Sequence, residues 1–460
     1  MAETSSTVAL NDSNETGLMT SSGKNETSKA TYAGIDAGLN IFSPQLTEKG
    51  VIKDIALDFF PLATIQKDKP IDFHIPYTNP YYLDLSKSTI RLKVRIVRED
   101  GTPIDKDDKV AFVNNILHTL FNKVDLVING KLTSPDVGVN FPYQQMMQIL
   151  TSYPVDFLQA SAGSQGFTKD TANFISSPTA SVDGENQGHF LRSQWTQEGQ
   201  YLSLEACIGH DLCYMNCYLP SSLPVNWRFW PSNDNFALLS ASAMAENYKY
   251  QIAEMSIRMH AVHLTEQVIS RHEARLASKM AVFHYPRSEI KTFTIPSGQV
   301  TYAINNLYSG TLPYDTYIGC VKTSSYIGSR TTSPFEFSHF GLRQVSLYIP
   351  QHQEMVYNLS FKENEYDYVN AYRNLYTTDS GTRFTPGIIT LDDFPGGYSL
   401  IRFRLSTADT VRENRVKQGT GRLTFTWDAP LIESVTVIVF NRFHDSIYMD
   451  ANRNIWLTEV

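Results

Sequence analysis

The densest group of potential metal ligands lies near the middle of the chain, where Cys207, His210, Cys213 and Cys217 fall within eleven residues. Thiolate sulfur and imidazole nitrogen are the usual ligands of zinc in proteins. The spacing lacks the Cys-x-x-Cys pair of structural zinc sites, and no second pair of ligands follows it. Cysteines buried along strands explain the pattern as well, and this is the interpretation that we favour.

A second group, His260 and His263 with His272 and Glu273 behind them, is also a weak metal candidate. The odd separation of His260 and His263 places them on opposite faces of a strand. A metal site of the cupin type needs a close His-x-His pair, a Glu and a later His, and the sequence has no such set. We therefore expect neither a metal nor another cofactor.

Sequence motifs of catalysis are missing as well. Gly17–Lys24 has five residues between its two glycines, whereas a phosphate-binding loop needs four, and no Gly-x-Ser-x-Gly nucleophile motif occurs. The charged tract Asp105–Lys109 fits a solvated turn better than a calcium loop, which needs ligands over about twelve positions. We expect no catalytic residues and no enzymatic activity.

Two further segments could bind a ligand or a polymer. The proline-flanked run Trp227–Trp230 could stack sugars or bases on its two tryptophans, although aromatic side chains at this density are more often part of a core or a subunit contact. The one basic region, with a local charge of +4, could face nucleic acid, an acidic neighbouring subunit or solvent. Its charged residues are Arg402, Arg404, Arg412, Arg415, Lys417 and Arg422, against Asp409 and Glu413.

Composition narrows the class of protein. The chain of 460 residues and 52.0 kDa carries 39 Lys and Arg against 47 Asp and Glu, a net charge of −8. Its 42% hydrophobic and 19% charged residues exclude an intrinsically disordered chain, and its 25 Tyr and 25 Phe favour β-structure. No apolar run reaches the ~18 residues of a membrane-spanning helix. Met1–Ala30 lacks the pattern of a secretory signal, and four cysteines suit a reducing compartment.

Apolar and polar residues alternate with a period of two along much of the chain from Val51, which is typical of strands with one buried face. Within 88–98, for example, Ile, Leu and Val alternate with Arg and Lys. Asn129-Gly130 between apolar runs predicts a tight hairpin. Residues 435–440 are apolar on both faces, as in the middle of a packed sandwich. Further strands are predicted at 255–261, 290–295, 345–349, 401–405 and 423–427.

Helical periodicity is scarce. It predicts one helix over Phe141–Tyr153, capped by Asn140 and apolar on one side, and a second over Thr265–Met280. The second helix lies between two strand-rich halves. We therefore expect a domain boundary there, with a first domain over 46–275 and a second over 276–460.

Three polar segments interrupt these patterns. Residues 1–45 are rich in Ser, Thr, Asn and Gly and are predicted to form a flexible N-terminal arm, because they cannot bury enough apolar surface to offset the entropy of ordering. Residues 154–200 are predicted to form a long polar loop that is functional, an insertion or partly disordered. A shorter polar loop is predicted at 377–397. Many short strands with long loops indicate an all-β chain of sandwiches or jelly rolls.

Several short segments occur in the order found in one family of proteins, over roughly residues 50–455. They are Phe112–Phe121, Val124–Leu126 with Asn129-Gly130, Phe141–Tyr143, Ile290–Pro296, Asn306-Leu307, Gly310–Pro313, Pro334–Phe337, Val416–Gly419 and Asp450–Asn454. The ordered set resembles the major capsid (hexon-like) proteins of Maverick/Polinton elements and the related adintoviruses. The arm and the loop at 154–200 depart from the family's pattern.

The resemblance implies an all-β double jelly roll, in which two eight-stranded sandwiches with a few short helices stand side by side. It implies that three subunits form a pseudo-hexameric capsomer and that capsomers tile an icosahedral shell around double-stranded DNA. The implied partners are the chain itself, penton and minor capsid proteins, and DNA only indirectly, without a membrane span. The implied location is the virion, after synthesis in the host cytoplasm or nucleus.

Two other functions remain open at this stage. A jelly-roll carbohydrate-binding or attachment protein would use Trp227 and Trp230 as its stacking pair. A β-sandwich hydrolase would need clustered carboxylates, which the sequence does not assign.

Overall fold

The structure is a computed structural model of the chain. It describes residues 50–460, except for 77–79, 134–139, 180, 182, 221, 242–247, 351–353, 363–364, 366, 378–386, 406–417 and 458–460. The predicted arm, 1–45, lies outside the described residues, and so does the middle of the predicted loop at 377–397. The description below concerns the unit that begins at Lys49.

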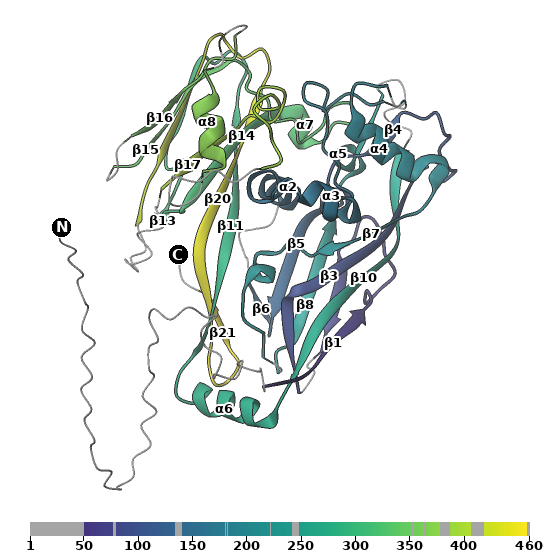
Figure 1. Ribbon diagram of the computed structural model, residues 1–460, viewed down its shortest axis with the longest axis vertical. Coiled ribbons are helices and arrows are strands. Elements are labelled where there is room, and N and C mark those ends of the chain that lie inside the picture. Colours follow the sequence, from purple (N-terminus) through teal and green to yellow (C-terminus); the bar gives the residue numbers. More distant parts are fainter. Residues whose placement is uncertain are drawn as a thin grey trace, which may run out of the picture. The chain divides into compact units, whose positions relative to one another are not determined.

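The first sandwich consists of two four-stranded antiparallel sheets (Figure 1). One has the order β1 (Val51–Phe59), β10 (Tyr248–Leu264), β3 (Tyr81–Arg98) and β7 (Leu202–Cys207). The other has the order β2 (Ile71–Ile75), β8 (Val225–Pro231), β5 (Phe121–Ile128) and β6 (Lys131–Leu132). Residues of both sheets share one apolar core, to which Leu92 of β3 and Phe229 of β8 belong.

The second sandwich has the same plan. One sheet has the order β11 (Ala281–Ile295), β20 (Val435–Met449), β14 (Asp315–Lys322) and β17 (Leu400–Arg404), with β21 (Ile455–Leu457) paired to β20. The other has the order β12 (Thr301–Ile304), β19 (Arg422–Trp427), β15 (Leu342–Tyr348) and β16 (Met355–Asn358). Two short pairs complete the strands, β4 (Val110–Phe112) with β9 (Leu238–Ser240) and β13 (Gly310–Thr311) with β18 (Gln418–Gly419). The predicted pair of eight-stranded sandwiches is therefore present.

Period-two alternation explains why these segments form strands. In β3 the side chains of Ile90, Leu92 and Val94 are buried, whereas the residues between them are half-buried. The predicted hairpin is also confirmed, because Ile128 pairs with Lys131 across Asn129 and Gly130. Both turn residues have positive φ values, 47° and 77°, as a two-residue turn of this type requires.

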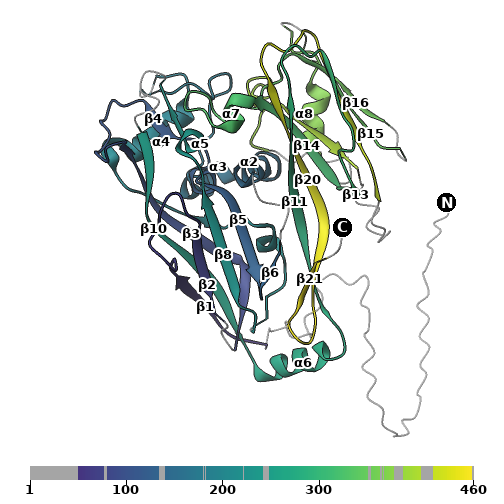
Figure 2. The same ribbon diagram turned by 180° about the vertical axis from the view of Figure 1, so that it is seen from behind.

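A layer of apolar side chains joins the two sandwiches, and we call it the central cluster. It contains residues of α2 (Phe141–Ser152), of β14 and β20, and of the segment before β15. Its main members are Tyr143, Met146, Met147, Ile149, Leu150, Tyr317, Val321, Phe335, Phe337, Ile438 and Phe440. Figures 1 and 2 show α2 between the strands of the two sandwiches from opposite sides.

The helix α2 corresponds closely to the predicted helix at Phe141–Tyr153, but two details of the prediction are wrong. The side chain of Asn140 does not cap the helix, since its Oδ1 atom accepts a hydrogen bond from the Tyr326 hydroxyl at 3.1 Å. The helix is also buried on nearly all sides, not on one. An amphipathic helix packs against one neighbour and leaves its other side in water, whereas α2 is buried on nearly all sides because a sandwich lies on either side of it.

The helix α6 (Glu266–Leu276) connects β10 to β11 and ends four residues before the predicted end at Met280. It exposes every residue at least partly. Val268 and Ile269 pack against a small apolar group formed by Tyr82, Val262 and Leu264. One narrow apolar stripe thus helps to hold the helix at the end of the first sandwich.

The prediction of a polar loop over 154–200 is wrong for much of that segment. It contains α3 (Phe157–Ala160), α4 (Gln187–Thr196) and the short 3-10 turns η2 (Ala162–Gln165) and η3 (Gln197–Gly199). The Asn186 side chain caps α4 by accepting a hydrogen bond from the backbone N–H of His189. Buried polar contacts stabilise this segment, and these leave no apolar period in the sequence. The remaining helices are α1 (Ile116–Thr119), η4 (Asp211–Tyr214), α5 (Asp234–Ala237), α7 (Thr323–Ile327) and α8 (Val369–Leu375).

Arg192 is the main polar link of this segment. Its side chain and that of Asp170 are only 1% and 3% exposed, and the two are 2.8 Å apart. Arg192 also donates hydrogen bonds to the carbonyl of Phe112 at 2.9 Å and to the hydroxyl of Thr168 at 2.7 Å. The guanidinium therefore ties α4 to β4 as well as to the residues around Asp170.

We predict that Arg192→Met lowers the free energy of unfolding by about 3–5 kcal/mol, because it leaves the Asp170 carboxylate buried without a counter-ion. Urea denaturation of the purified protein would measure the loss. Arg271→Met, at an exposed position on α6, is the matched control and should change the free energy by about 0.5 kcal/mol or less. A loss below about 1 kcal/mol for Arg192→Met would contradict the prediction.

Candidate functional site

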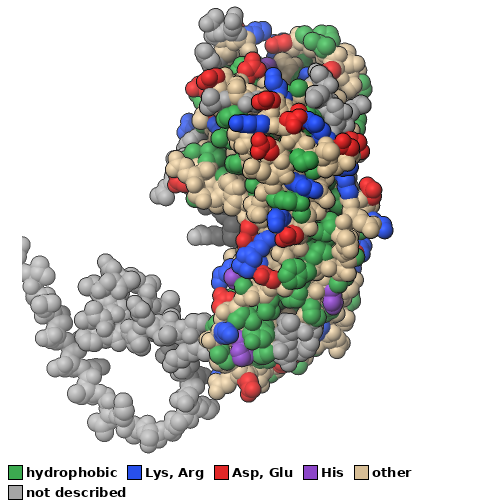
Figure 3. All heavy atoms as spheres, turned by 90° about the vertical axis from the view of Figure 1, so that its right-hand side faces the viewer, with side chains coloured by type: hydrophobic (Ala, Val, Ile, Leu, Met, Phe, Trp, Pro, Cys, Tyr) green, Lys and Arg blue, Asp and Glu red, His purple; other side chains and the backbone are tan. Residues whose placement is uncertain are grey.

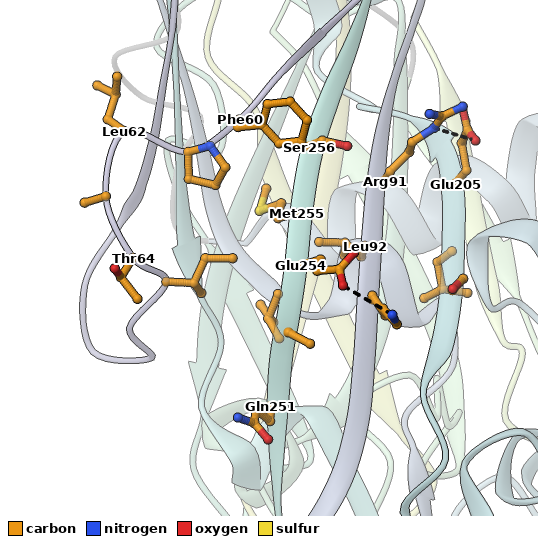
Figure 4. Close-up of a pocket in the computed structure, with 18 of the residues that line it drawn as sticks. Phe60, Leu62, Thr64, Arg91, Leu92, Glu205, Gln251, Glu254, Met255 and Ser256 are labelled. Carbon is orange, nitrogen blue, oxygen red and sulfur yellow. Dashed lines mark hydrogen bonds and ion pairs between the residues drawn. The ribbon is translucent and has the colours of Figure 1, made fainter.

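A groove of about 1370 Å³ lies on the outer face of the sheet β1-β10-β3-β7. One wall is the segment 60–65, which follows β1 and leaves the sheet (Figure 4). Residues 251–256 of β10, which Figure 4 shows between that wall and β3, form the floor together with Arg91 and Lys93 of β3. Phe60 and Leu62 on the wall are 71% and 68% exposed, which is unusual for large apolar side chains.

Ion pairs within the chain neutralise the floor of the groove. Arg91 Nε lies 2.8 Å from a Glu205 oxygen, and Lys93 Nζ lies 3.2 Å from Glu254, as the dashed lines in Figure 4 show. Beside the groove, Arg258 donates two hydrogen bonds to Asp58, at 2.8 and 3.0 Å, and these lower the pKa of Asp58. Exposed ion pairs of this kind typically contribute about 0–1 kcal/mol each to the free energy of unfolding. The main effect of these pairs is that the acidic and basic side chains of the groove already neutralise one another.

The groove follows an open strand edge. β1 pairs with β10 only as far as Phe59, which lies opposite Ile257. Over Tyr248–Ser256, β10 pairs with β3 on its other side, and no second strand among the described residues pairs with it there. An open edge beside exposed apolar side chains can accept an extended segment of another chain. The groove is therefore suited to contact with a protein.

The surface of the second sandwich differs in charge. The strands β12, β19, β15 and β16 contain only two charged residues, Arg343 and Arg422, whereas the strands of the sheet β1-β10-β3-β7 contain thirteen. Tyr348 and Val356 are exposed on this low-charge sheet. Figure 3 faces the side of the molecule that carries the first sandwich, and there acidic and basic side chains are interspersed instead of being gathered by sign. Subunit interfaces are typically poor in charge at their centres.

The structure separates the two tryptophans that the sequence suggested as a stacking pair. Trp227 is fully buried in the core of the first sandwich, where its ring lies 5.5 Å from that of His210. Trp230 lies on the other face of β8, is 38% exposed, and donates a hydrogen bond from Nε1 to Asp125 at 3.1 Å. A shared platform is excluded, because the two positions are three residues apart on one strand. The burial of Trp227 agrees with the preferred interpretation, in which these aromatic side chains belong to a core.

The Cys and His residues that suggested zinc do not form a ligand set. Cys213 is buried, Cys207 is half-buried and Cys217 is exposed. His210 is enclosed in the core, and its Nδ1 accepts a hydrogen bond from the backbone N–H of Leu212 at 3.2 Å. Among the residues that the structure describes, no three His, Cys, Asp or Glu side chains come close enough to hold a metal ion.

The histidines of the second candidate group have separate partners. His260 Nδ1 lies 3.8 Å from Asp54, and the ring of His263 lies 5.1 Å from that of Tyr81. His272 Nδ1 shares a hydrogen bond with the Tyr82 hydroxyl at 3.1 Å. Each of these three rings thus has a different neighbour.

The predicted basic region is not a continuous surface patch. Arg402 is buried and makes two hydrogen bonds to the carboxylate of Asp315, at 2.9 and 2.6 Å. Arg404 lies 3.8 Å from the same carboxylate, and Arg422 is exposed on β19. The other members, Arg412, Arg415 and Lys417 with Asp409 and Glu413, lie outside the described residues. A surface role for Arg402 is therefore wrong, since it serves as the counter-ion of Asp315.

Sequence reasoning missed Asp211, which connects the two halves of the chain. Its carboxylate accepts hydrogen bonds from the Gln144 side chain of α2 at 2.8 Å and from the backbone N–H of Ser288 in β11 at 2.6 Å. Burial raises its pKa to about 7, although the hydrogen bonds from Ser288 oppose this shift. Its partners are 67 and 77 residues away, so no local pattern indicates them. The groove was missed too, and its only signal was the apolar run around Phe60.

Buried histidines predict that acid destabilises the protein. Burial lowers the pKa values of His118, His189 and His210 to about 4, below their ordinary 6.5. The folded state thus favours neutral imidazole, and this stabilisation is complete above pH 6.5 and is lost as the pH falls towards 4. Each histidine contributes on the order of 3 kcal/mol. Asp211 has the opposite effect. Its pKa is raised in the folded state, so the stability that it contributes is complete below pH 3.8 and is lost as the pH rises to about 7.

We therefore predict that the free energy of unfolding falls between pH 6.5 and 4, and falls more steeply in Asp211→Asn, which removes the opposing group. Urea denaturation at half-unit steps of pH would measure both slopes. A free energy that stays level or rises as the pH falls would contradict the assignment of neutral buried histidines.

Comparison with known proteins finds a relative in sequence. No protein-family model matches the chain. The uncharacterized protein F54H12.2 of Caenorhabditis elegans is 25% identical over 409 residues, which cover 85% of this chain and 93% of that protein. The two chains therefore correspond over most of their lengths.

Solved structures that are similar to the chain come from viral capsids. A chain of the Sputnik virophage cryo-EM structure has a TM-score of 0.58 at 12% identity, over 93% of this chain and 92% of that one. PBCV-1 Vp54 has a TM-score of 0.54 at 11% identity, over 91% and 99%. The mavirus major capsid protein has a TM-score of 0.51 at 10% identity, over 97% and 96%.

These similarities show which fold the chain has. At 10–12% identity they extend over nearly the whole chain and agree with the two sandwiches described above. Within the described part of the chain, no helix is both long and apolar enough to cross a membrane. The prediction of an all-β chain with a few short helices is confirmed, and its fold is the double jelly roll of viral capsid proteins.

Proposed function

We propose that the chain is a major capsid protein that forms trimeric, pseudo-hexameric capsomers, and that these tile an icosahedral shell around double-stranded DNA. The observation that carries the proposal is the pair of eight-stranded sandwiches joined by the central cluster, which has the same fold as solved capsid proteins over nearly the whole chain. The sandwiches would correspond to residues 46–275 and 276–460. The protein would reside in the virion, with penton and minor capsid proteins as further partners.

The surfaces described above support assembly from identical copies. A ring of three subunits needs two different surfaces that fit one another, because each contact is heterologous. The groove with exposed Phe60 and Leu62 is one such surface, and the low-charge sheet with Tyr348 and Val356 is another. Neither surface requires an oppositely charged partner, since the first is balanced internally and the second carries little charge.

The Maverick/Polinton or adintovirus type is the form of this function that we propose. It rests on the ordered segments of the sequence and on a relative in an animal, Caenorhabditis elegans, that matches over 93% of its length. An enzymatic role is not part of the proposal. The carbohydrate-binding alternative loses its stacking pair, because Trp227 is buried in the core.

We predict that the purified protein has a native mass of about 156 kDa, three times 52.0 kDa, because the proposed capsomer is a trimer. Light scattering would measure the mass, and electron microscopy of the same sample should show pseudo-hexagonal particles or shells. A stable monomer of 52.0 kDa that forms no larger particle would contradict the proposed function.

We also predict that the double substitution Phe60→Lys and Leu62→Lys raises the protein concentration needed for assembly at least tenfold. Two charges on this wall would have to be desolvated in a subunit contact. Light scattering over a dilution series would measure the shift. Ile432→Lys, at a position that is 99% exposed, is the matched control and should assemble like the unmodified protein. If the double variant and the control assemble equally well, the groove is not a subunit contact.

A further inference from the structure

A second cavity, of about 520 Å³, lies beside α6 and is separate from the groove. Its walls come from α6 and the turn after it, from the first residues of β11, and from the loop at 216–220. Tyr82 of β3 and Met449 of β20 complete it. The cavity thus lies where α6 joins the two sandwiches, and its volume falls in the range of about 300–1000 Å³ that is typical of small-molecule sites.

The interior of this cavity is mainly apolar. Leu264, Phe283 and Met449 contribute buried side chains, and Leu276 and Met280 contribute side chains nearer the surface. These groups come from β10, β11, β20, α6 and the turn after α6, so the cavity is bounded by the fold and not by one flexible loop. An apolar body of a ligand would be removed from water there, which stabilises a complex by about 0.8 kcal/mol for each buried methylene group.

Cations mark one side of the cavity. Arg453 is paired with Glu273, so these two charges cancel. Arg275 and Lys279 also line the cavity, are exposed, and make no ion pair with any residue that the structure describes. The net charge that the cavity offers to a ligand is therefore positive, and it lies at the exposed side, away from the apolar interior.

We propose that this cavity binds a single-chain anionic amphiphile, namely a free long-chain carboxylate. The apolar tail lies against Leu264, Phe283 and Met449, and the carboxylate lies near Arg275 and Lys279. A purely apolar ligand would leave the two cations unused, and a cationic amphiphile would be repelled by them. The proposal does not depend on the capsid function, because it concerns a cavity within one chain.

Cys217 provides a direct assay, since this exposed thiol lines the cavity. The rate of its alkylation by iodoacetamide can be followed by mass spectrometry of the peptide. We expect dodecanoate, kept below its micelle concentration, to slow the reaction at least fivefold. Octanoate should need at least a tenfold higher concentration, since it buries four fewer methylene groups. Dodecyltrimethylammonium, with the opposite charge, should give no protection.

Variants of α6 and the turn after it test the role of the cations. Arg275→Ser combined with Lys279→Ser should weaken the protection by dodecanoate by up to about fivefold for each cation removed. Arg271→Ser, on the same helix but outside the cavity lining, is the matched control and should behave like the unmodified protein. Both sets of positions are exposed, so neither change should alter folding, and circular dichroism would verify this.

Three results would overturn the proposal. One is unchanged alkylation of Cys217 with dodecanoate, and another is equal protection by dodecanoate and dodecyltrimethylammonium. The third is protection by phosphatidylglycerol vesicles without protection by free dodecanoate, which would assign the cavity to membrane phospholipid. Because alkylation is measured whether or not shells form, failure here is distinguishable from failure of the capsid assignment.

Discussion

The strand β20 has to be covered by apolar groups on both of its faces, and much of the structure depends on this requirement. Val435, Val437 and Val439 point into the core of the second sandwich, whereas Ile438 and Phe440 point into the central cluster. The partner sheet of the second sandwich covers only the first set. The second set would face water without α2, at a cost of roughly 25 cal/mol for each Å² of apolar surface exposed. The second sandwich is thus complete only when the first supplies this helix.

Buried polar groups fix how neighbouring elements meet, and one of them, Asp211, lies between the two sandwiches. Asp211 connects η4 to α2 and β11, and Arg402 pairs with Asp315 between β17 and β14. The pair of Arg192 and Asp170 does the same for the 154–200 segment. Buried ion pairs add little net stability compared with apolar groups of the same size, but each tolerates only one arrangement of its donors and acceptors. In this chain the apolar central cluster joins the two sandwiches, and the hydrogen bonds of Asp211 restrict how they meet.

The sequence predicted strands well because a strand's pattern is local. The alternation in 88–98, the Asn129-Gly130 turn and the fully apolar run at 435–440 each correspond to what the structure contains. The odd spacing of Trp227 and Trp230 already implied opposite faces of a strand, so the hypothesis of a stacking pair could have been rejected from the sequence. The helices near 154–200 were not predictable, because Arg192 and Asp170 stabilise that segment through partners distant in sequence. The burial of Arg402 likewise depends on Asp315, which is 87 residues away.

The two candidate surfaces are the sheet faces that no other part of the described structure covers. Core packing and the central cluster cover the inner faces of the sheets, so the outer faces of β1-β10-β3-β7 and β12-β19-β15-β16 remain for other partners. The strands of the first carry eight basic and five acidic residues, which keep this face hydrated and cost desolvation energy wherever it is buried. The second has few charges to desolvate and can be buried at lower cost. A contact centred on the low-charge sheet, with the charged sheet at its rim, is therefore the arrangement that these two surfaces favour.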